Sequence, residues 1–284
     1  MISQIFTALE TADPYIVYGV MVVGCVVVVA ILESLFPAYQ QTNNQNRRLC
    51  ANFGLAAINM GLALALPLSS AWALELCRSN GFGLLNWLAS SLWISVPISV
   101  AAASLGAWLS HYAMHRVPLF WRFHAIHHSD REMDYSTSLR HHPGSHLIMP
   151  AMTTPVMAVL GLHPETIAVM ATIYWAANIF SHANVRIPRH INARLAWLII
   201  TPTMHAVHHS SWRPETDSNF GALFSGWDRL FGTLREDFAA TGAEIKLGLE
   251  EISPAQSRDL IGLLLHPART VAAAPTLPQP AQAN

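Results

Sequence analysis

Long apolar segments separated by short polar breaks dominate the first half of the chain. The segment from Tyr15 to Phe36 holds a single charged residue, Glu33, and a second apolar segment covers roughly Phe53 to Leu76. A helix needs about 20 apolar residues to cross the hydrocarbon core of a bilayer, and both segments reach that length. We therefore predict two membrane-spanning helices, separated by a polar break that contains Arg47 and Arg48.

A third stretch, from Leu84 to Tyr112, is again nearly uncharged. It predicts either one long helix or a short interfacial helix followed by a span, with a kink or break at Pro97. Two shorter apolar segments follow at 147–162 and 167–180, separated by a turn-like sequence, and they predict a helical hairpin that enters the membrane and returns. Together these segments predict an all-α integral membrane protein with about four transmembrane helices.

Charged residues concentrate between His115 and His146, where seven histidines also lie. We expect this segment and the mixed polar stretch 185–251 to form a histidine-rich helical cap on the membrane. Cytoplasmic segments of membrane proteins carry excess Lys and Arg, which places this cap on the cytoplasmic side. Residues 1–265 form a single predicted domain, and the Ala-, Pro- and Gln-rich tail 266–284 is predicted to be disordered.

Composition supports the membrane assignment and argues against a nucleic-acid partner. Hydrophobic residues make up 52% and charged residues 12% of the chain, with a mean hydropathy of +0.32, whereas soluble domains carry about 25% charged residues. A net charge of −1 predicts no nucleic-acid partner.

The N-terminus lacks the basic region and cleavage site of a signal peptide, so we expect the first span to be retained. Cys25, Cys50 and Cys77 have no CxxC spacing and are expected to be small apolar residues.

The fifteen histidines of the chain form a repeated pattern. One HxxxH motif is followed by two HxxHH motifs, whose histidines occupy positions i, i+3 and i+4. On a helix with 3.6 residues per turn, such side chains share a stripe roughly 100° wide. Polar groups at a membrane boundary are costly to bury unless they are coordinated, so the pattern predicts metal binding. The eight candidate ligands, about right for two metal ions, are His111, His115, His124, His127, His128, His205, His208 and His209.

The histidine pattern alone does not identify the metal, because imidazole binds zinc, copper, iron and nickel. The sequence has neither the HExxH motif of zinc peptidases nor the ExxH motif of soluble di-iron carboxylate bundles. A haem offers only its axial positions to the protein, so haem cannot account for so many histidines. Two redox-active irons surrounded by neutral imidazoles is the hypothesis that remains.

The ordered motifs on a multi-span chain resemble those of the fatty acid hydroxylase / sterol desaturase superfamily, in particular its bacterial members. The resemblance covers about residues 90–236, which we take as the catalytic region. Members of this superfamily use two iron ions, dioxygen and external electrons to hydroxylate or desaturate lipid C–H bonds. The similar segments are WRFHAIHHSDREMDYSTSLRHHP (Trp121–Pro143), FSHANVRIP (Phe180–Pro188), TPTMHAVHHS (Thr201–Ser210) and ETDSNFGALFSGWDRLFGTL (Glu215–Leu234).

The resemblance implies two further iron ligands, His142 and His182. Metal-bound imidazoles usually donate their second N–H to a carboxylate or carbonyl, and Asp130, Asp134 and Asn184 lie close enough in sequence to serve. Asp228 is expected to have a structural role. The histidines expected to be surface or turn residues are His141, which stands where similar sequences often have an aromatic residue, and His146, His163, His190 and His266.

The resemblance implies an enzyme of lipid biosynthesis in a bacterial cytoplasmic membrane, acting on a fatty acyl, sterol or related lipid. The chain has no ferredoxin-like cysteine set and no flavin or nicotinamide motif. Electrons should therefore come from a separate ferredoxin- or cytochrome-type reductase system. Two alternatives stay open: an ether-lipid, sphingoid-base or carotenoid hydroxylase, and a histidine-rich membrane metal-binding or transport protein. The near absence of ionisable residues in the first two spans disfavours transport.

Overall fold

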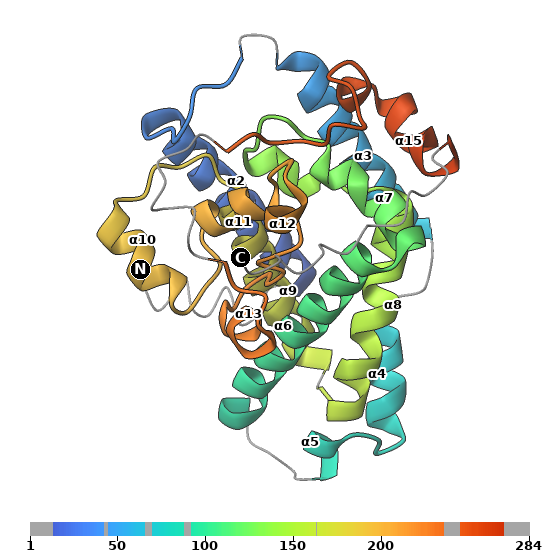
Figure 1. Ribbon diagram of the computed structural model, residues 1–284. Helices are drawn as coiled ribbons and strands as arrows, with labels where there is room; N and C mark the ends of the chain where they lie inside the picture. The colour runs from blue at the N-terminus through green and yellow to red at the C-terminus, as the bar shows by residue number, and fades with distance from the viewer. Residues whose placement is uncertain are drawn as a thin grey trace, which may run out of the picture.

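Helices account for the regular structure in the computed structural model, which describes residues 14–42, 45–65, 70–87, 92–162, 164–235 and 245–269 (Figure 1). Across these ranges β-pairing is limited to isolated bridges, so the predicted all-α fold is confirmed. The helices are α2 (Pro14–Leu35), α3 (Asn46–Ala65), α4 (Ser70–Ser79), α5 (Leu84–Trp87), α6 (Leu92–Arg116), α7 (Pro118–His128), α8 (Pro143–Leu160), α9 (Pro164–Ser181), α10 (Arg189–Ala196), α11 (Pro202–His208), α12 (Arg213–Thr216), α13 (Gly226–Phe231) and α15 (Leu260–Arg269), with the 3-10 helices η1 (Tyr135–Leu139) and η2 (Gln256–Arg258).

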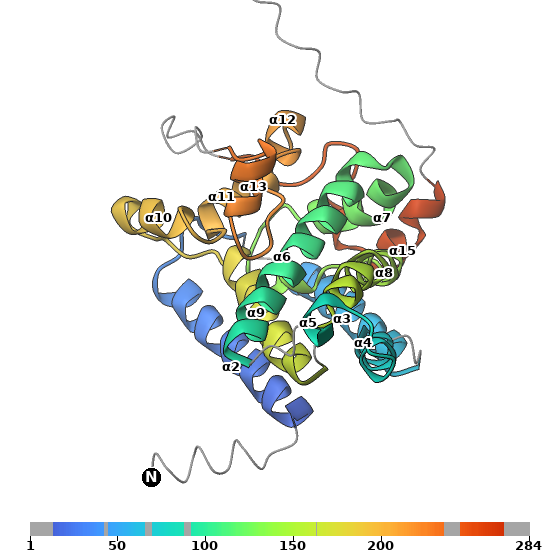
Figure 2. The same ribbon diagram turned by 90° about the horizontal axis from the view of Figure 1, so that it is seen from below.

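The long helix α6 lies at the centre of the molecule (Figures 1 and 2). Both α8 and α9 pack on α6, and α2 packs on α9. α4 contacts α8 and α9, and lies with α5 towards the lower end of Figure 1. α7 follows α6 and packs against it, while α11 contacts α9. The short helices α7, α11 and α12 thus gather at the end of the bundle opposite α5, where α6 terminates.

The apolar helices support the predicted membrane location. Asn46–Ala65 and Ile94–Arg116 are long and apolar enough to cross a membrane, and shorter apolar helices cover Gly19–Leu35 and Val169–Ser181. α2 turns large apolar side chains outward: Val20 is 66% exposed. Exposed apolar surface on this scale is typical of contact with lipid or with another protein.

The predicted second span is wrong at its start. We predicted one helix from Phe53 to Leu76, but α3 begins at Asn46. Residues 66–69 of the predicted span lie outside the described residues, and α4 covers Ser70–Ser79. Arg48, predicted to lie in a polar break, is a buried residue of α3 because it pairs with Asp130.

The region 84–112 has the short helix followed by a span, one of the two predicted alternatives. α5 is a single turn, and α6 runs without a break from Leu92 to Arg116. The predicted kink or break at Pro97 does not interrupt the helix. Proline removes one backbone N–H and crowds the carbonyl four residues earlier. For Pro97 that carbonyl belongs to the first turn of α6, where the disturbance is small.

The predicted hairpin is formed by α8 and α9, which are joined at Gly161 in the left-handed conformation (φ 70°). His163 lies outside the described residues. Beside this turn an apolar cluster of Leu74, Leu85, Met157, Leu162 and Met170 closes the lower end of the bundle. The turn therefore serves to fix the ends of α8 and α9 against α4 and α5.

Gly83 lies so close to this turn that no residue with a side chain fits in its place. Its φ is 111°, and a Cβ at this position would lie 2.2 Å from Gly161 Cα. We expect Gly83→Ala to destabilise the folded protein by about 1–3 kcal/mol through overpacking alone. The matched control is Gly81→Ala, where φ is 64° but a Cβ would meet nothing within 4 Å. Thermal unfolding in detergent should show a clearly larger loss at 83; equal losses would contradict the close contact.

The C-terminal helix extends further than predicted. We placed the start of a disordered tail at His266, but α15 continues to Arg269. Leu263 of this helix packs into a cluster with Ala51, Leu55 and Ile126, and Pro267 is also buried. Because one face of α15 is buried against α3 and α7, the residues after His266 stay helical. The rest of the predicted tail, 270–284, lies outside the described residues.

Candidate metal centre

The C-terminal ends of α6, α7, α9 and α11 bring the predicted histidines together, with His182 directly after α9. His111 and His115 occupy the last two turns of α6, and α7 begins at once with Pro118, a residue favoured at the first helical position. The first HxxHH motif forms the last turns of α7. The second lies on α11, whose Thr201 caps the helix by accepting a hydrogen bond from the Met204 N–H.

Nine of the ten predicted ligands lie in two compact, fully buried groups. Within each group one ring nitrogen per residue lies within 4.8 Å of the others. Neighbouring residues of each HxxHH motif belong to different groups, and the rings of His128 and His209 stack at 4.4 Å across the boundary. Group A consists of His111, His115, His124, His128 and His208, and group B consists of His127, His182, His205 and His209.

Backbone carbonyls fix the protonation of several rings. His111 Nδ1 lies 2.9 Å from the Phe220 carbonyl oxygen, His182 Nδ1 lies 2.7 Å from that of Asn178, and His208 Nδ1 lies 2.7 Å from that of Ser218. Because a carbonyl only accepts, each Nδ1 carries the proton and donates it. Each Nε2 therefore holds a free lone pair, as a metal ligand must.

These lone pairs point at one another. The Nε2 atoms of His111 and His208, which both carry a lone pair, lie 3.0 Å apart. Two lone pairs at this distance repel unless a cation or proton lies beside them. Burial lowers the pKa of His208 well below its usual range, so a second proton does not relieve this contact. The Nε2 atoms of His182 and His205 are also 3.0 Å apart. The arrangement fits two metal cations.

The structure keeps His142 out of both groups. Its Nε2 lies 3.1 Å from the Leu264 carbonyl, and its Nδ1 accepts a hydrogen bond from Gly144 N–H at the start of α8. His141, which we predicted to be a surface or turn residue, lies at the site instead. Its ring stacks on His127 at 4.6 Å, and its Nδ1 is buried without a hydrogen-bond partner.

The predicted carboxylate partners of the ligands also lie elsewhere. Asp130 accepts hydrogen bonds from Arg48 and Thr137, and Asp134 accepts from Arg48 and Ser136. They bind α3 to η1 rather than orienting an imidazole.

Asn184, the third predicted partner, accepts hydrogen bonds from the backbone N–H groups of Ala38 and Tyr39 and donates to the Tyr39 carbonyl. It joins the end of α9 to the segment after α2. Asp228, expected to be structural, accepts hydrogen bonds from Trp108 and from the backbone of Phe220, and so fixes the carbonyl that binds His111.

A carboxylate that the sequence did not single out contacts one of the clustered histidines. Asp217 Oδ1 lies 3.3 Å from His115 Nδ1 and also pairs with Arg213 at 3.3 Å. Burial raises the pKa of Asp217, although Arg213 and Arg116 oppose this shift. Asp217 follows the second HxxHH motif in a polar stretch with several acidic residues, so spacing alone does not distinguish it.

Asp217→Asn should weaken metal binding by about 10- to 100-fold, because outer partners of ligating histidines contribute effects of this size. The amide keeps the volume of the side chain but loses the charge that favours a ligating imidazole. The measurement is the dissociation constant for ferrous iron of the purified protein. Glu250→Gln, at an exposed carboxylate paired with Lys246, is the control. Equal affinities of the two variants would contradict a role for Asp217.

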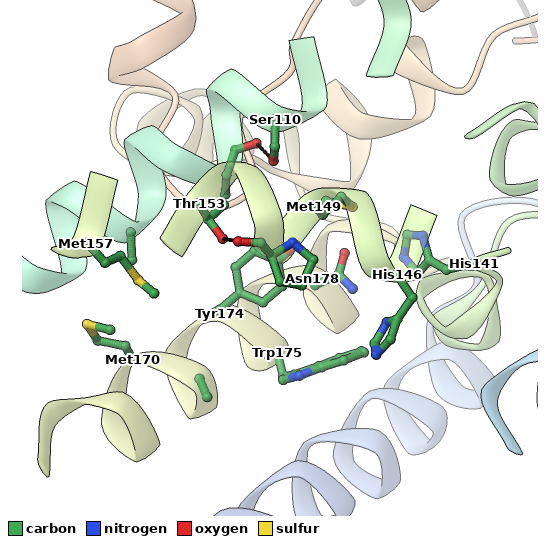
Figure 3. Close-up of a pocket in the computed structure, with 14 residues that line it drawn as sticks. Ser110, His141, His146, Met149, Thr153, Met157, Met170, Tyr174, Trp175 and Asn178 are labelled. Carbon is green, nitrogen blue, oxygen red and sulfur yellow. Dashed lines mark hydrogen bonds between the residues drawn. The ribbon is translucent and has the colours of Figure 1, made fainter. Parts of the chain in front are cut away.

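An apolar cavity of about 350 Å³ lies between α6, α8 and α9 and leads to the histidines (Figure 3). A small pocket among the histidines continues it, and the two share Ala107, His141, Met149, Tyr174 and Asn178. The pocket is lined by members of both groups, including His111, His124, His127, His182 and His205. A hydrocarbon chain in the cavity would therefore end beside the candidate metal centre.

Fold and site define a class: a helical, membrane-type metalloprotein with two buried histidine groups at the end of an apolar cavity. The chain belongs to the fatty acid hydroxylase family, whose model matches residues 96–233 and so covers the histidines of all three motifs. This confirms the family resemblance found in the sequence and makes the protein a member of an oxidoreductase family.

Several curated relatives are similar to the chain. It is 23% identical over 254 residues to the ornithine lipid hydroxylase OlsE of Rhizobium tropici, covering 85% of this chain and 76% of that protein. It is 27% identical over 203 residues to the alkylglycerol monooxygenase of Homo sapiens (69% and 42% covered). The identity to the very-long-chain aldehyde decarbonylase GL1-1 of Oryza sativa subsp. indica is 27% over 179 residues (58% and 28%). The match thus spans less than half of the last two proteins. No solved structure matches the chain significantly.

Proposed function

We propose that the protein is a membrane enzyme that uses two iron ions, dioxygen and external electrons to hydroxylate or desaturate a lipid C–H bond. The observation that carries this proposal is the end-to-end arrangement of the apolar cavity and the two histidine groups. Membership of the fatty acid hydroxylase family and similarity to lipid hydroxylases support it.

Different residues contribute to metal binding, to the protonation of the histidines and to the position of the substrate. Groups A and B would each hold one iron ion, and the bound irons would supply the oxidising chemistry that the side chains lack. The carbonyls of Phe220, Asn178 and Ser218 keep the ligating nitrogens deprotonated. Asp217 orients His115. The apolar walls exclude water from the C–H bond and hold it next to the metals.

The topology that we propose has three crossings, formed by α2, α3 and α6, and the α8–α9 hairpin, which enters the membrane and returns to the same side. α2 would face lipid with its exposed valines, such as Val20 and Val23. The histidine end of the bundle would form a cap on the cytoplasmic side. The exposed Arg47 at the start of α3 and Arg116 at the end of α6 agree with this orientation, because cytoplasmic ends of membrane helices are enriched in Lys and Arg.

We propose that electrons from a separate ferredoxin- or cytochrome-type protein enter near Trp121. Its ring lies 5.0 Å from that of His115 and 5.5 Å from that of His128, both in group A. The guanidinium of Arg213, whose side chain is 34% exposed, lies over the same indole at 4.5 Å. Trp121 therefore connects the solvent-facing side of α12 with the candidate metal centre.

Comparative lipid mass spectrometry of cells with and without the gene tests the proposed function. We expect one lipid class to gain one oxygen atom, or to lose two hydrogen atoms, only when the gene is present. A strain that carries the His208→Ala gene is the control, and it should match the strain without the gene. Identical lipid profiles in all strains, together with no dioxygen consumption by the purified iron-loaded protein, would refute the proposal.

A further inference from the structure

The short helix α10 lies at the outer edge of the molecule in both views of the fold (Figures 1 and 2). One side of the helix is packed against the rest of the protein, because Ala196 belongs to a buried apolar cluster with Ile200 and Met204. The Ala196 carbonyl also accepts a hydrogen bond of 3.2 Å from the guanidinium of Arg229 in α13. α10 is therefore held firmly on its inner side, while its other side faces outward.

The outward side of α10 is both apolar and basic. Trp197 is 73% exposed, and Leu198 is also exposed. These two residues follow the exposed Arg194 by three and four positions, so the three side chains share one face of the helix. Arg186 and Arg189 are exposed at the start of the helix. We call these five residues the α10 surface.

No carboxylate neutralises the arginines of the α10 surface. The chain has no Asp or Glu from residue 166 to residue 214. Within the described residues, Arg186, Arg189 and Arg194 make no ion pair and no side-chain hydrogen bond. A single exposed arginine needs no partner in water. Three of them beside exposed tryptophan and leucine form the combination that binds the surface of an anionic bilayer.

The start of the α10 surface is fixed at the end of α2, the helix whose exposed valines we assign to lipid. The Arg186 N–H donates to the Phe36 carbonyl at 2.8 Å, and Val185 forms a β-bridge with Pro37. Phe36 is exposed and directly follows the last residue of α2. Because the exposed apolar surface of α2 ends at this level, Arg186 lies where the hydrocarbon core meets the phospholipid headgroups.

The other end of the α10 surface is fixed to the central helix α6 through α13. The Leu198 carbonyl accepts a hydrogen bond of 3.2 Å from the N–H of Ser225, which directly precedes α13. In α13, Trp227 donates to Ser104 of α6 at 3.2 Å, and Leu230 is 68% exposed. Ser104 lies in the apolar part of α6 that we assign to the membrane. Both ends of the α10 surface thus adjoin lipid-facing segments, which favours lipid over a soluble protein as the partner.

We propose that the α10 surface lies in the headgroup layer of the cytoplasmic leaflet and binds anionic phospholipid. Trp197 and Leu198 insert at the boundary with the acyl chains, where tryptophan is enriched in membrane proteins, and the three arginines bind phosphate groups. Since α10 and α11 share one apolar cluster, this contact fixes the depth of the second HxxHH motif. The inference uses the proposed topology but not the proposed reaction, and the surface is separate from the apolar cavity.

Spin-label depth measurements on the full-length protein, in nanodiscs that contain phosphatidylglycerol, test the position. The label is attached at Ala193→Cys, an exposed site of α10, after the three natural cysteines have been changed to alanine. Its relative accessibility to dioxygen and to a water-soluble nickel complex should lie between those of labels at Val23→Cys, in α2, and Lys246→Cys, at an exposed side chain. A label at 193 that is as accessible to the nickel complex as the label at 246 would overturn the proposal.

Lipid binding tests the charge. Native mass spectrometry of the detergent-solubilised protein gives the dissociation constant for added phosphatidylglycerol. Changing Arg186, Arg189 and Arg194 together to Gln should weaken binding roughly 100-fold, because each basic side chain near an anionic surface contributes about fivefold. Changing the same three residues to Lys keeps the charge and should leave binding nearly unchanged. Binding that survives in the Gln variant, or equally tight binding of phosphatidylcholine by the unmodified protein, would overturn the proposal.

The proposed function and this inference fail separately. If the label at 193 has headgroup depth but the protein oxidises no lipid, only the proposed function fails. If the protein oxidises lipid while this label lies in water, only the assignment of the α10 surface fails.

Discussion

Replacing His127 or His208 by Ala should remove one metal ion per chain and lower lipid oxidation by more than about 100-fold. His127 belongs to group B and His208 to group A, so each substitution opens a different group. The loss should exceed the 10- to 100-fold effect of removing a mere partner of a ligand. Metal content per chain, measured by inductively coupled plasma mass spectrometry on protein extracted from the membrane, checks the prediction directly.

Two other histidine variants serve as controls for this experiment. His190→Ala changes an exposed residue of α10 and should keep both metals and full activity. His142→Ala should also keep both metals, because its ring nitrogens face Leu264 and Gly144 rather than either group. Loss of a metal from His142→Ala, or full metal content in His127→Ala and His208→Ala, would contradict the assignment of the two groups.

Arg48→Met should destabilise the folded protein by about 3–5 kcal/mol, the usual cost of removing one partner from a buried ion pair. Arg48 is only 2% exposed, lies 3.0 Å from Asp130, and pairs with Asp134 as well. The variant leaves the buried Asp134 without its ion pair and Asp130 with only the charge of Arg140 nearby. Unfolding in mixed micelles measures the effect, and Arg47→Met, at the exposed neighbouring residue, should change stability little.

The size of this effect should depend on the two carboxylates. Adding Asp130→Asn and Asp134→Asn to Arg48→Met removes the uncompensated charges, so the triple variant should recover much of the lost stability. If the triple variant is as unstable as Arg48→Met alone, the loss comes from packing and not from the buried charges. Neither result depends on the proposed enzymatic activity.

The spacing of the histidines predicted which residues would meet, because helix periodicity places positions i, i+3 and i+4 on one stripe. It did not predict how they divide between the two groups. His127 and His128 point about 100° apart on α7, which is enough to direct them to different groups once α6, α9 and α11 surround the helix end. That division depends on packing between distant segments.

The misplaced site residues have the same cause. His141 and His142 follow the 3-10 helix η1, and His142 has an extended backbone (φ −67°, ψ 143°). Adjacent side chains in an extended segment point to opposite sides, so His141 stacks on His127 while His142 faces Leu264 and Gly144. Asp217 contacts His115 across 102 residues of sequence, and no local pattern carries that information.

The membrane segments were predicted from length and hydropathy, and those properties do not locate helix ends. Arg48 shows why: a charged residue is compatible with an apolar helix when Asp130 and Asp134 neutralise it. The hydropathy of residues 53–76 gives no sign that α3 begins at Asn46. The ion pairs of Arg48 allow the helix to begin before the apolar segment, and a window average does not detect them.

Incubation of the purified, iron-loaded protein with its lipid, a reducing system and ¹⁸O-labelled dioxygen tests the central claim most directly. We expect consumption of dioxygen, with either one ¹⁸O atom in a hydroxylated lipid and the other in water, or both ¹⁸O atoms in water when the lipid becomes an alkene. His208→Ala protein should give neither product. No consumption of dioxygen by the wild-type protein, or a hydroxylated lipid whose new oxygen is unlabelled, would contradict it.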